Sequence, residues 1–197
     1  MKTFSEIFDK HSWEIVSDSI FSKTRNDVES ALNKKTKRGL EDFKALVSPA
    51  AAPFLEEMAS LSHRLTQKRF GKTIQLYTPM YLSNECQNIC TYCAFSYDNK
   101  IKRVTLNKKQ ILDEIKVIKK MGFDHILIVT GESNNFVGMD YFRLVLPILR
   151  PHFSHISFEV QPMARAEYGE LISLGVNTVL VYQETYHEEN YRKYHPK

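Results

Sequence analysis

From residue 73 onward, short apolar runs rich in β-branched residues alternate with segments of helical periodicity. The expected strands cover residues 74–77, 125–130, 156–160 and 178–183, and the expected helices cover residues 107–121, 140–149 and 165–174. Glycines follow two of these helices, at Gly122 and Gly175, where a residue in the left-handed conformation commonly ends a helix. Strands that alternate with helices in this way predict an α/β fold with a parallel sheet.

Residues 1–72 have a different pattern, which is helical. Thr24 is expected to cap a helix that runs through Leu32, and Pro53 is expected to open another helix. Both segments carry apolar stripes that indicate core packing, formed by Val28, Ala31 and Leu32 and by Phe54, Met58, Leu61 and Leu65. We therefore expect a helical N-terminal region, residues 1–72, followed by an incomplete βα barrel, residues 73–197.

The composition is that of an ordered globular protein. Of the 197 residues, 43% are hydrophobic and 25% are charged, which argues against disordered, collagen-like and coiled-coil chains. The apolar runs are far shorter than the roughly 20 residues of a transmembrane helix, and the N-terminus has no signal-peptide pattern. We therefore expect a cytoplasmic protein with no membrane contact.

The formal net charge is +4, and basic residues gather in two runs, within residues 34–38 and 100–109. Runs of this kind usually form solvated faces, and we prefer this interpretation to nucleic-acid binding. We therefore expect no nucleic-acid partner.

The last residues predict an incomplete barrel. Four strands rarely close a βα barrel, and a parallel sheet that ends on the apolar residues 179–181 would leave an exposed edge. After residue 183 we expect a polar loop with no further helix. The expected architecture is thus a truncated barrel of about four βα units.

The three cysteines of the chain, Cys86, Cys90 and Cys93, lie within eight residues. An odd number of thiols without a secretion signal argues against a disulfide framework, so the group indicates a metal site. A cubane iron-sulfur cluster bound by three thiolates keeps one iron open to a further ligand. A structural zinc site would need a fourth protein ligand, for which His125 and Glu132 are candidates without zinc-finger spacing.

Further polar residues follow the other expected strands. In parallel sheets the ligand site lies beyond the carboxyl ends of the strands. The candidates there are, in chain order, Gly131, Glu132, Glu159, Gln161, Gln183 and Glu184. Glu159 and Gln161 would share one face of an alternating strand with Ser157, so both could reach a ligand. A salt bridge from Glu159 to another strand, and helix capping by Glu132, are the structural alternatives.

The Cys-x3-Cys-x2-Cys spacing, with Tyr92 directly before the third cysteine, resembles the motif of the radical S-adenosylmethionine superfamily. The resemblance implies that the three cysteines bind a [4Fe-4S] cluster and that S-adenosylmethionine chelates the fourth iron. It also implies that Gly131 and Glu132 bind the methionine ammonium, although Thr130 replaces the first glycine of the commoner motif. Tyr92 would pack near the adenine, with plain hydrophobic shielding as the alternative.

Within this superfamily the chain resembles the tyrosine lyases of thiamine biosynthesis, the 2-iminoacetate synthases. The supporting segments are residues 46–51, 81–84, 122–123, 129–132, 138–142, 159–162 and 181–187. The resemblance covers the first half of that family's length and implies a partial (βα)6 barrel preceded by helices. It implies cleavage of the Cα–Cβ bond of L-tyrosine to 2-iminoacetate and p-cresol, with thiazole synthase and a reducing electron donor of the flavodoxin type as partners. The fragment alone is expected to be inactive.

Two alternative functions stay open. One is another aromatic-amino-acid radical lyase, such as the tyrosine lyase of hydrogenase maturation, which carries an additional C-terminal cluster. The other is a non-catalytic iron-sulfur or zinc-binding module. Catalytic residues stay unassigned, because the histidines are expected mostly on the surface.

Overall fold

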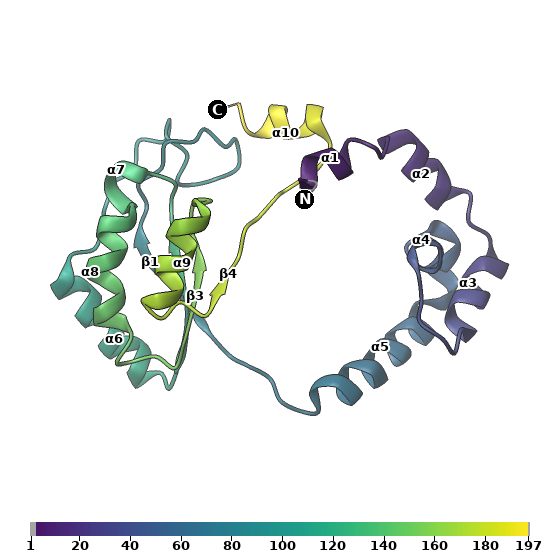
Figure 1. Cartoon of the computed structure of the whole chain (residues 1–197), viewed down its shortest axis with the longest axis horizontal. Helices are drawn as coiled ribbons and strands as arrows, with labels where there is room; N and C mark the ends of the chain where they lie inside the picture. Colours follow the sequence, from purple (N-terminus) through teal and green to yellow (C-terminus); the bar gives the residue numbers. More distant parts are fainter. Residues whose placement is uncertain (1–2, 197) are drawn as a thin grey trace. The chain divides into compact units, whose positions relative to one another are not determined.

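The computed structural model describes residues 3–196 and divides the chain into two compact units, residues 1–73 and residues 74–197 (Figure 1). Each unit has a hydrophobic core of its own. The helical segment and the βα segment therefore bury their apolar side chains separately.

The described part of the first unit is helical, as predicted. Its elements are α1 (Phe4–Phe8), α2 (Trp13–Phe21), α3 (Arg25–Asn33), α4 (Leu40–Leu46), the 3₁₀ helix η1 (Pro49–Phe54) and α5 (Leu55–Phe70). Thr24 caps α3 as predicted, because its hydroxyl accepts from the Asp27 N–H while the Asp27 carboxylate accepts from the Thr24 N–H. Pro53 does not open a helix. It lies inside η1, since the turn has already begun with the Ala51 N–H donating to the Ser48 carbonyl.

The second unit contains a four-stranded parallel sheet in the order β1-β2-β3-β4 (Figure 1). The strands are β1 (Thr78–Ser83), β2 (His125–Thr130), β3 (His155–Glu159) and β4 (Thr178–Val179). The helices are α6 (Lys108–Lys120), α7 (Asn134–Val137), α8 (Met139–Leu149), α9 (Arg165–Ser173) and α10 (Glu188–Tyr194). Gly122 and Gly175 have φ angles of 87° and 103°, so the predicted left-handed helix ends and the parallel α/β sheet are both confirmed.

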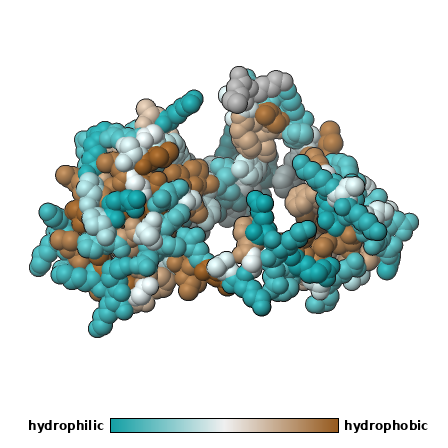
Figure 2. All heavy atoms as spheres, turned by 60° about the horizontal axis from the view of Figure 1, so that its bottom comes forward, coloured by the Kyte–Doolittle hydropathy of each residue, from teal (hydrophilic) through white to brown (hydrophobic). Residues whose placement is uncertain are grey.

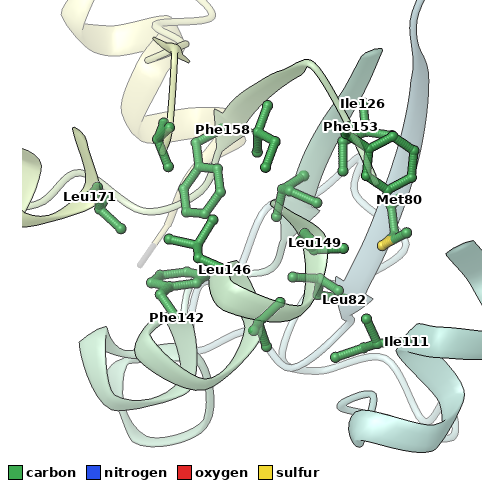
Figure 3. Close-up of a cluster of buried hydrophobic side chains, with 14 of the residues drawn as sticks. Met80, Leu82, Ile111, Ile126, Phe142, Leu146, Leu149, Phe153, Phe158 and Leu171 are labelled. Carbon is green, nitrogen blue, oxygen red and sulfur yellow. The ribbon is translucent and has the colours of Figure 1, made fainter. Parts of the chain in front are cut away.

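Strand and helix side chains form one core on the helix-covered face of the sheet (Figure 3). The strands contribute Met80, Leu82, Ile126 and Phe158, and the helices contribute Ile111, Phe142, Leu146, Leu149 and Leu171. The rings of Phe142 and Phe158 lie 5.0 Å apart between α8 and β3. Each buried side chain of this size contributes about 1.5–3 kcal/mol, so this core holds the helices on the sheet and leaves the other face for a ligand.

Two strands differ from their predicted limits. The expected strand at residues 74–77 is exposed and irregular, and β1 begins at Thr78, because Thr78 is the first residue that pairs with β2, opposite Ile126. β4 ends at Val179 instead of Gln183, because its pairing stops where Phe158 of β3 lies opposite Val179. Both limits are set by the partner strand, which hydrophobic alternation alone does not reveal.

The expectation of a polar loop without a helix after residue 183 is wrong. Residues 188–194 form α10, and the His187 ring caps it through Nδ1, which accepts from the Asn190 N–H at 3.3 Å. Glutamates occupy the first turn and basic residues the last, which matches the helix dipole. This charge pattern is the local signal that favours the helix.

Large hydrophobic side chains remain on the surface of both units (Figure 2). In the second unit they include Ile172, Val181 and Tyr182, which are 66%, 62% and 63% exposed. Of the apolar residues expected at the β4 edge, Val179 and Val181 are exposed and Leu180 is half-buried. Within residues 3–196, no helix combines the length and the hydrophobicity that crossing a membrane requires.

We predict that Tyr141→Phe lowers the free energy of unfolding by about 1 kcal/mol at neutral pH, because the Tyr141 hydroxyl donates to the Leu106 carbonyl at 2.8 Å. Burial raises the pKa of Tyr141 from 10.0 to about 12. The unfolded tyrosine therefore ionises first, and the wild type loses stability as the pH rises from about 10 to about 12. Urea unfolding followed by circular dichroism should show the stability advantage of the wild type over the variant shrinking, and then reversing, as the pH rises above about 10. A gap independent of pH would contradict the buried placement of this hydroxyl.

Candidate functional site

A cavity of about 710 Å³ lies at the carboxyl edge of the sheet. Its floor includes Tyr81, Val129 and Glu159, which lie opposite one another in the registers of β1, β2 and β3 and so form one row across the sheet. Their side chains point away from the helix-covered core because residues alternate between the two faces of a strand. The three cysteines also line this cavity. The parallel register therefore brings the predicted metal ligands and the predicted Glu159 together.

The cysteines lie on the segment that follows β1, which we call the cysteine loop (residues 84–103). A short ladder closes its base: the Leu106 N–H donates to the Leu82 carbonyl at 2.8 Å, and the Asn84 N–H donates to the Val104 carbonyl at 3.2 Å. The thiols of Cys86, Cys90 and Cys93 are free and half-buried. Because these two hydrogen bonds close the base of the loop, the three thiols stay beside the cavity at the carboxyl edge of the sheet.

Gly131 and Glu132, at the end of β2, contact the cysteine loop directly. The Glu132 carbonyl accepts from the Gln87 N–H at 2.8 Å, and its carboxylate Oε2 accepts from the Asn88 side chain at 2.9 Å. A Cβ atom at position 131 would lie 2.3 Å from the Glu85 carbonyl oxygen, so the loop approaches as close as glycine permits. Glu132 lines the cavity and bonds to the loop, which does not fit the helix-capping alternative.

The described residues that line the cavity include glutamates and cysteines but no lysine, arginine or histidine. The carboxylates are Glu132, Glu159 and Glu184. Burial raises the pKa of the Cys90 thiol, and the neighbouring cysteines and glutamates raise it further. Negative charge is therefore uncompensated in this cavity, and a cationic occupant would be stabilised there.

Tyr92 stands at the rim of the cavity and is held by α10. Its hydroxyl lies 2.7 Å from His195 Nε2, and the Thr91 N–H donates to the Tyr194 carbonyl at 3.0 Å. Burial, followed by the charge of Glu184, raises the pKa of Tyr92 to about 12. His195 was expected on the surface as one of the unassigned histidines. No spacing in the sequence could have linked it to Tyr92, because the contact depends on the unpredicted α10.

Two predicted ligand contacts do not reach the cavity. Gln161 is buried behind the sheet end, where its Nε2 donates to the Val137 carbonyl at 2.9 Å and to Asn134 Oδ1 at 3.1 Å. It leaves the face of Glu159 because β3 ends at Glu159 and the strand alternation ends with it. Gln183 is exposed and donates to the Thr185 carbonyl at 3.1 Å. Its neighbour Glu184 lines the cavity instead.

The donor set fits a metal cluster better than a single ion. Within residues 3–196, no three cysteine, histidine or acidic side chains converge as the ligands of one ion must. A zinc ion needs each thiolate about 2.3 Å from one point, whereas a cubane cluster takes each thiolate on a different iron. Of the two suggested zinc ligands, Glu132 lines the cavity, but His125 begins β2 and so lies at the opposite end of that strand.

Comparison with known sequences gives a match between residues 80–197 and the family model described as the Radical SAM superfamily. The chain is 51% identical over all 197 residues to 2-iminoacetate synthase of Escherichia coli (strain K12) and 49% identical to that of Salmonella typhimurium (strain LT2). It covers 52% of each of these proteins, so it spans about half the length of the curated relatives it matches. A 3-methylornithine synthase of Methanosarcina acetivorans is 27% identical over 156 residues, which are 78% of this chain and 44% of that protein.

Solved structures share the fold. The FeFe-hydrogenase maturase HydG from Carboxydothermus hydrogenoformans superimposes with a TM-score of 0.86 at 27% identity, covering 100% of this chain and 48% of that one. Methylornithine synthase (PylB) gives a TM-score of 0.63 at 24% identity, covering 91% of this chain and 50% of that one. The sheet and its helices are therefore a partial barrel of this type, preceded by a helical region, as predicted.

We predict that Gly131→Ala destabilises the protein by about 1–3 kcal/mol, because the new methyl group would collide with the Glu85 carbonyl and force the cysteine loop away. Gly169→Ala is the matched control, since Gly169 lies in α9 with no atom within 4 Å of the added Cβ. It should be neutral or stabilise the helix by up to about 1 kcal/mol. Chemical denaturation measures both variants, and equal stability of Gly131→Ala and wild type would refute the close approach.

Proposed function

Because the chain belongs to the radical SAM superfamily, we propose that its cavity binds a [4Fe-4S] cluster through Cys86, Cys90 and Cys93, and S-adenosylmethionine beside it. The observation that carries this proposal is the cavity itself, in which three free thiols and three carboxylates meet without a basic residue among the described lining residues. When bound, the two groups supply a 5′-deoxyadenosyl radical by reductive cleavage of the sulfonium.

Glu132 is suited to bind the ammonium of S-adenosylmethionine. Asn88 donates to Oε2 and fixes the carboxylate, and the other oxygen, Oε1, has no hydrogen bond within residues 3–196. An ammonium that leaves water for a half-buried site requires a charged acceptor, which this oxygen supplies. Glu132 therefore orients the methionine end of the ligand toward the thiols.

The nucleoside end of S-adenosylmethionine is suited to contact three other lining residues, Tyr92, Glu159 and Glu184. All three line the cavity, and Tyr92 is fixed from outside by His195. A carboxylate accepts hydrogen bonds from ribose hydroxyls, and an aromatic ring offers a flat apolar surface to adenine. A volume of about 710 Å³ lies within the usual range of ligand pockets, about 300–1,000 Å³.

We infer that this chain is the N-terminal half of a tyrosine lyase. The reaction of the whole enzyme would be cleavage of the Cα–Cβ bond of L-tyrosine to 2-iminoacetate and p-cresol. The identities of 51% and 49% to 2-iminoacetate synthases support this inference. On the same basis, thiazole synthase and a flavodoxin-type electron donor are the proposed partners. A lyase of the hydrogenase-maturation type is the second candidate. The TM-score of 0.86 to HydG favours it, but the sequence identity to HydG is only 27%.

We predict that Cys86→Ala, Cys90→Ala and Cys93→Ala each prevent assembly of an intact cluster after anaerobic reconstitution, because each removes one of only three thiols. Iron and acid-labile sulfide analysis measures the result. Tyr97→Phe is the control, since Tyr97 lies in the same loop but its side chain is 64% exposed. Wild-type iron and sulfide content in any cysteine variant would overturn the ligand assignment.

We predict that Glu132→Gln weakens binding of S-adenosylmethionine by about ten- to a hundredfold, since a charge-assisted hydrogen bond contributes about 1.5–3 kcal/mol. The cluster should assemble normally, because the Gln87 contact uses the backbone of Glu132 and survives the change. Equilibrium dialysis on the reconstituted protein gives the affinity. Unchanged affinity with a full cluster would remove Glu132 from the ligand site.

A further inference from the structure

We propose that Arg103 is a positioning residue that holds the cysteine loop in its ligand-ready shape before any cluster binds. The proposal rests on the proposed function, because it concerns how the three thiols are presented to the cluster. Arg103 itself does not line the cavity.

The Arg103 guanidinium donates to backbone carbonyls on both sides of the three cysteines in the chain. Nη1 donates to the carbonyls of Asn84 at 2.6 Å and Phe95 at 2.8 Å. Nη2 donates to the carbonyls of Ser96 at 2.7 Å, Asn99 at 3.3 Å and Tyr97 at 3.4 Å. One side chain therefore ties Asn84, which lies two residues before the first cysteine, to the turn that follows the third cysteine.

Two of the five carbonyls that accept from Arg103 belong to residues whose side chains contact a cysteine. The Ser96 hydroxyl accepts from the Cys90 N–H at 3.2 Å, and the Asn99 side chain donates to the Cys93 carbonyl at 3.0 Å. Ser96 and Asn99 are thus held on one side by Arg103 and contact a cysteine on the other. Arg103 is therefore connected to two of the three cysteines through a single intervening residue in each case.

Arg103 has no carboxylate partner within 4 Å in residues 3–196. A half-buried positive charge without an ion pair is costly unless other dipoles compensate it, and here five carbonyl oxygens do so. The arrangement requires guanidinium geometry, because a planar fork with five N–H donors reaches several carbonyls at once and a lysine ammonium does not.

All of these contacts are made by the protein alone. On this proposal the loop keeps its shape in the cluster-free protein, and the placement of the thiols does not require metal. Preorganised ligands lose less conformational entropy when the metal binds, so Arg103 favours cluster assembly without touching the cluster.

The test compares Arg103→Gln and Arg103→Lys with the control Lys102→Gln in the full chain. Lys102 is exposed, and its described contact with the loop is made through its backbone carbonyl. In the cluster-free protein, both Arg103 variants should increase amide hydrogen exchange of residues 90–97 by about tenfold or more. The β2 and β3 amides should keep wild-type exchange, and the control should match wild type throughout.

Reconstitution supplies the second readout. Both Arg103 variants should hold less than half of the wild-type iron and sulfide, while Lys102→Gln should match wild type.

Arg103→Ala should recover loop protection and cluster content on addition of ethylguanidinium but not of ethylammonium. A variant that had only lost general stability would not show this selective recovery. Wild-type loop exchange in Arg103→Gln, or a full cluster in Arg103→Lys, would overturn the proposal. A wild-type chain that binds no cluster would instead refute the proposed function, and the exchange experiment would still test Arg103.

Discussion

The parallel register of β1, β2 and β3 decides where this protein can do chemistry. It places the end of β1, which continues into the cysteine loop, beside the end of β2, which continues into Gly131 and Glu132. At Gly131 the two backbones approach so closely that no side chain fits between them. The contacts of Glu132 with the loop, and the closeness of the carboxylate to the thiols, follow from this approach.

Charge gives the cavity its chemical preference. Three glutamates and three thiols line a half-open space into which no described basic side chain projects. Arg103, a basic residue of the cysteine loop, directs its guanidinium to carbonyls of that loop. Because its charge is taken up there, the cavity itself stays electronegative and suited to a metal cluster and to a ligand that carries an ammonium and a sulfonium.

The sequence predicted those parts that depend on local patterns. β2 and helices α6, α8 and α9 follow from periodicity, and the meeting of the cysteines with Glu132 follows from their positions directly after parallel strands. The start of β1, the burial of Gln161 and the contact of His195 with Tyr92 were missed, because each depends on a partner distant in the chain. Arg103 was missed for the same reason, since a basic run reads as a solvated face until the carbonyls around it are known.

On the proposed function, a small molecule and no fourth protein side chain completes the metal coordination at the three thiols. Electron-nuclear double resonance on the reduced protein with S-adenosylmethionine labelled with ¹⁵N at its amine tests this most directly. The account predicts a hyperfine coupling between the cluster and the labelled nitrogen in the wild type. Absence of that coupling from a fully assembled cluster, together with a coupling to a nitrogen of the protein, would contradict it.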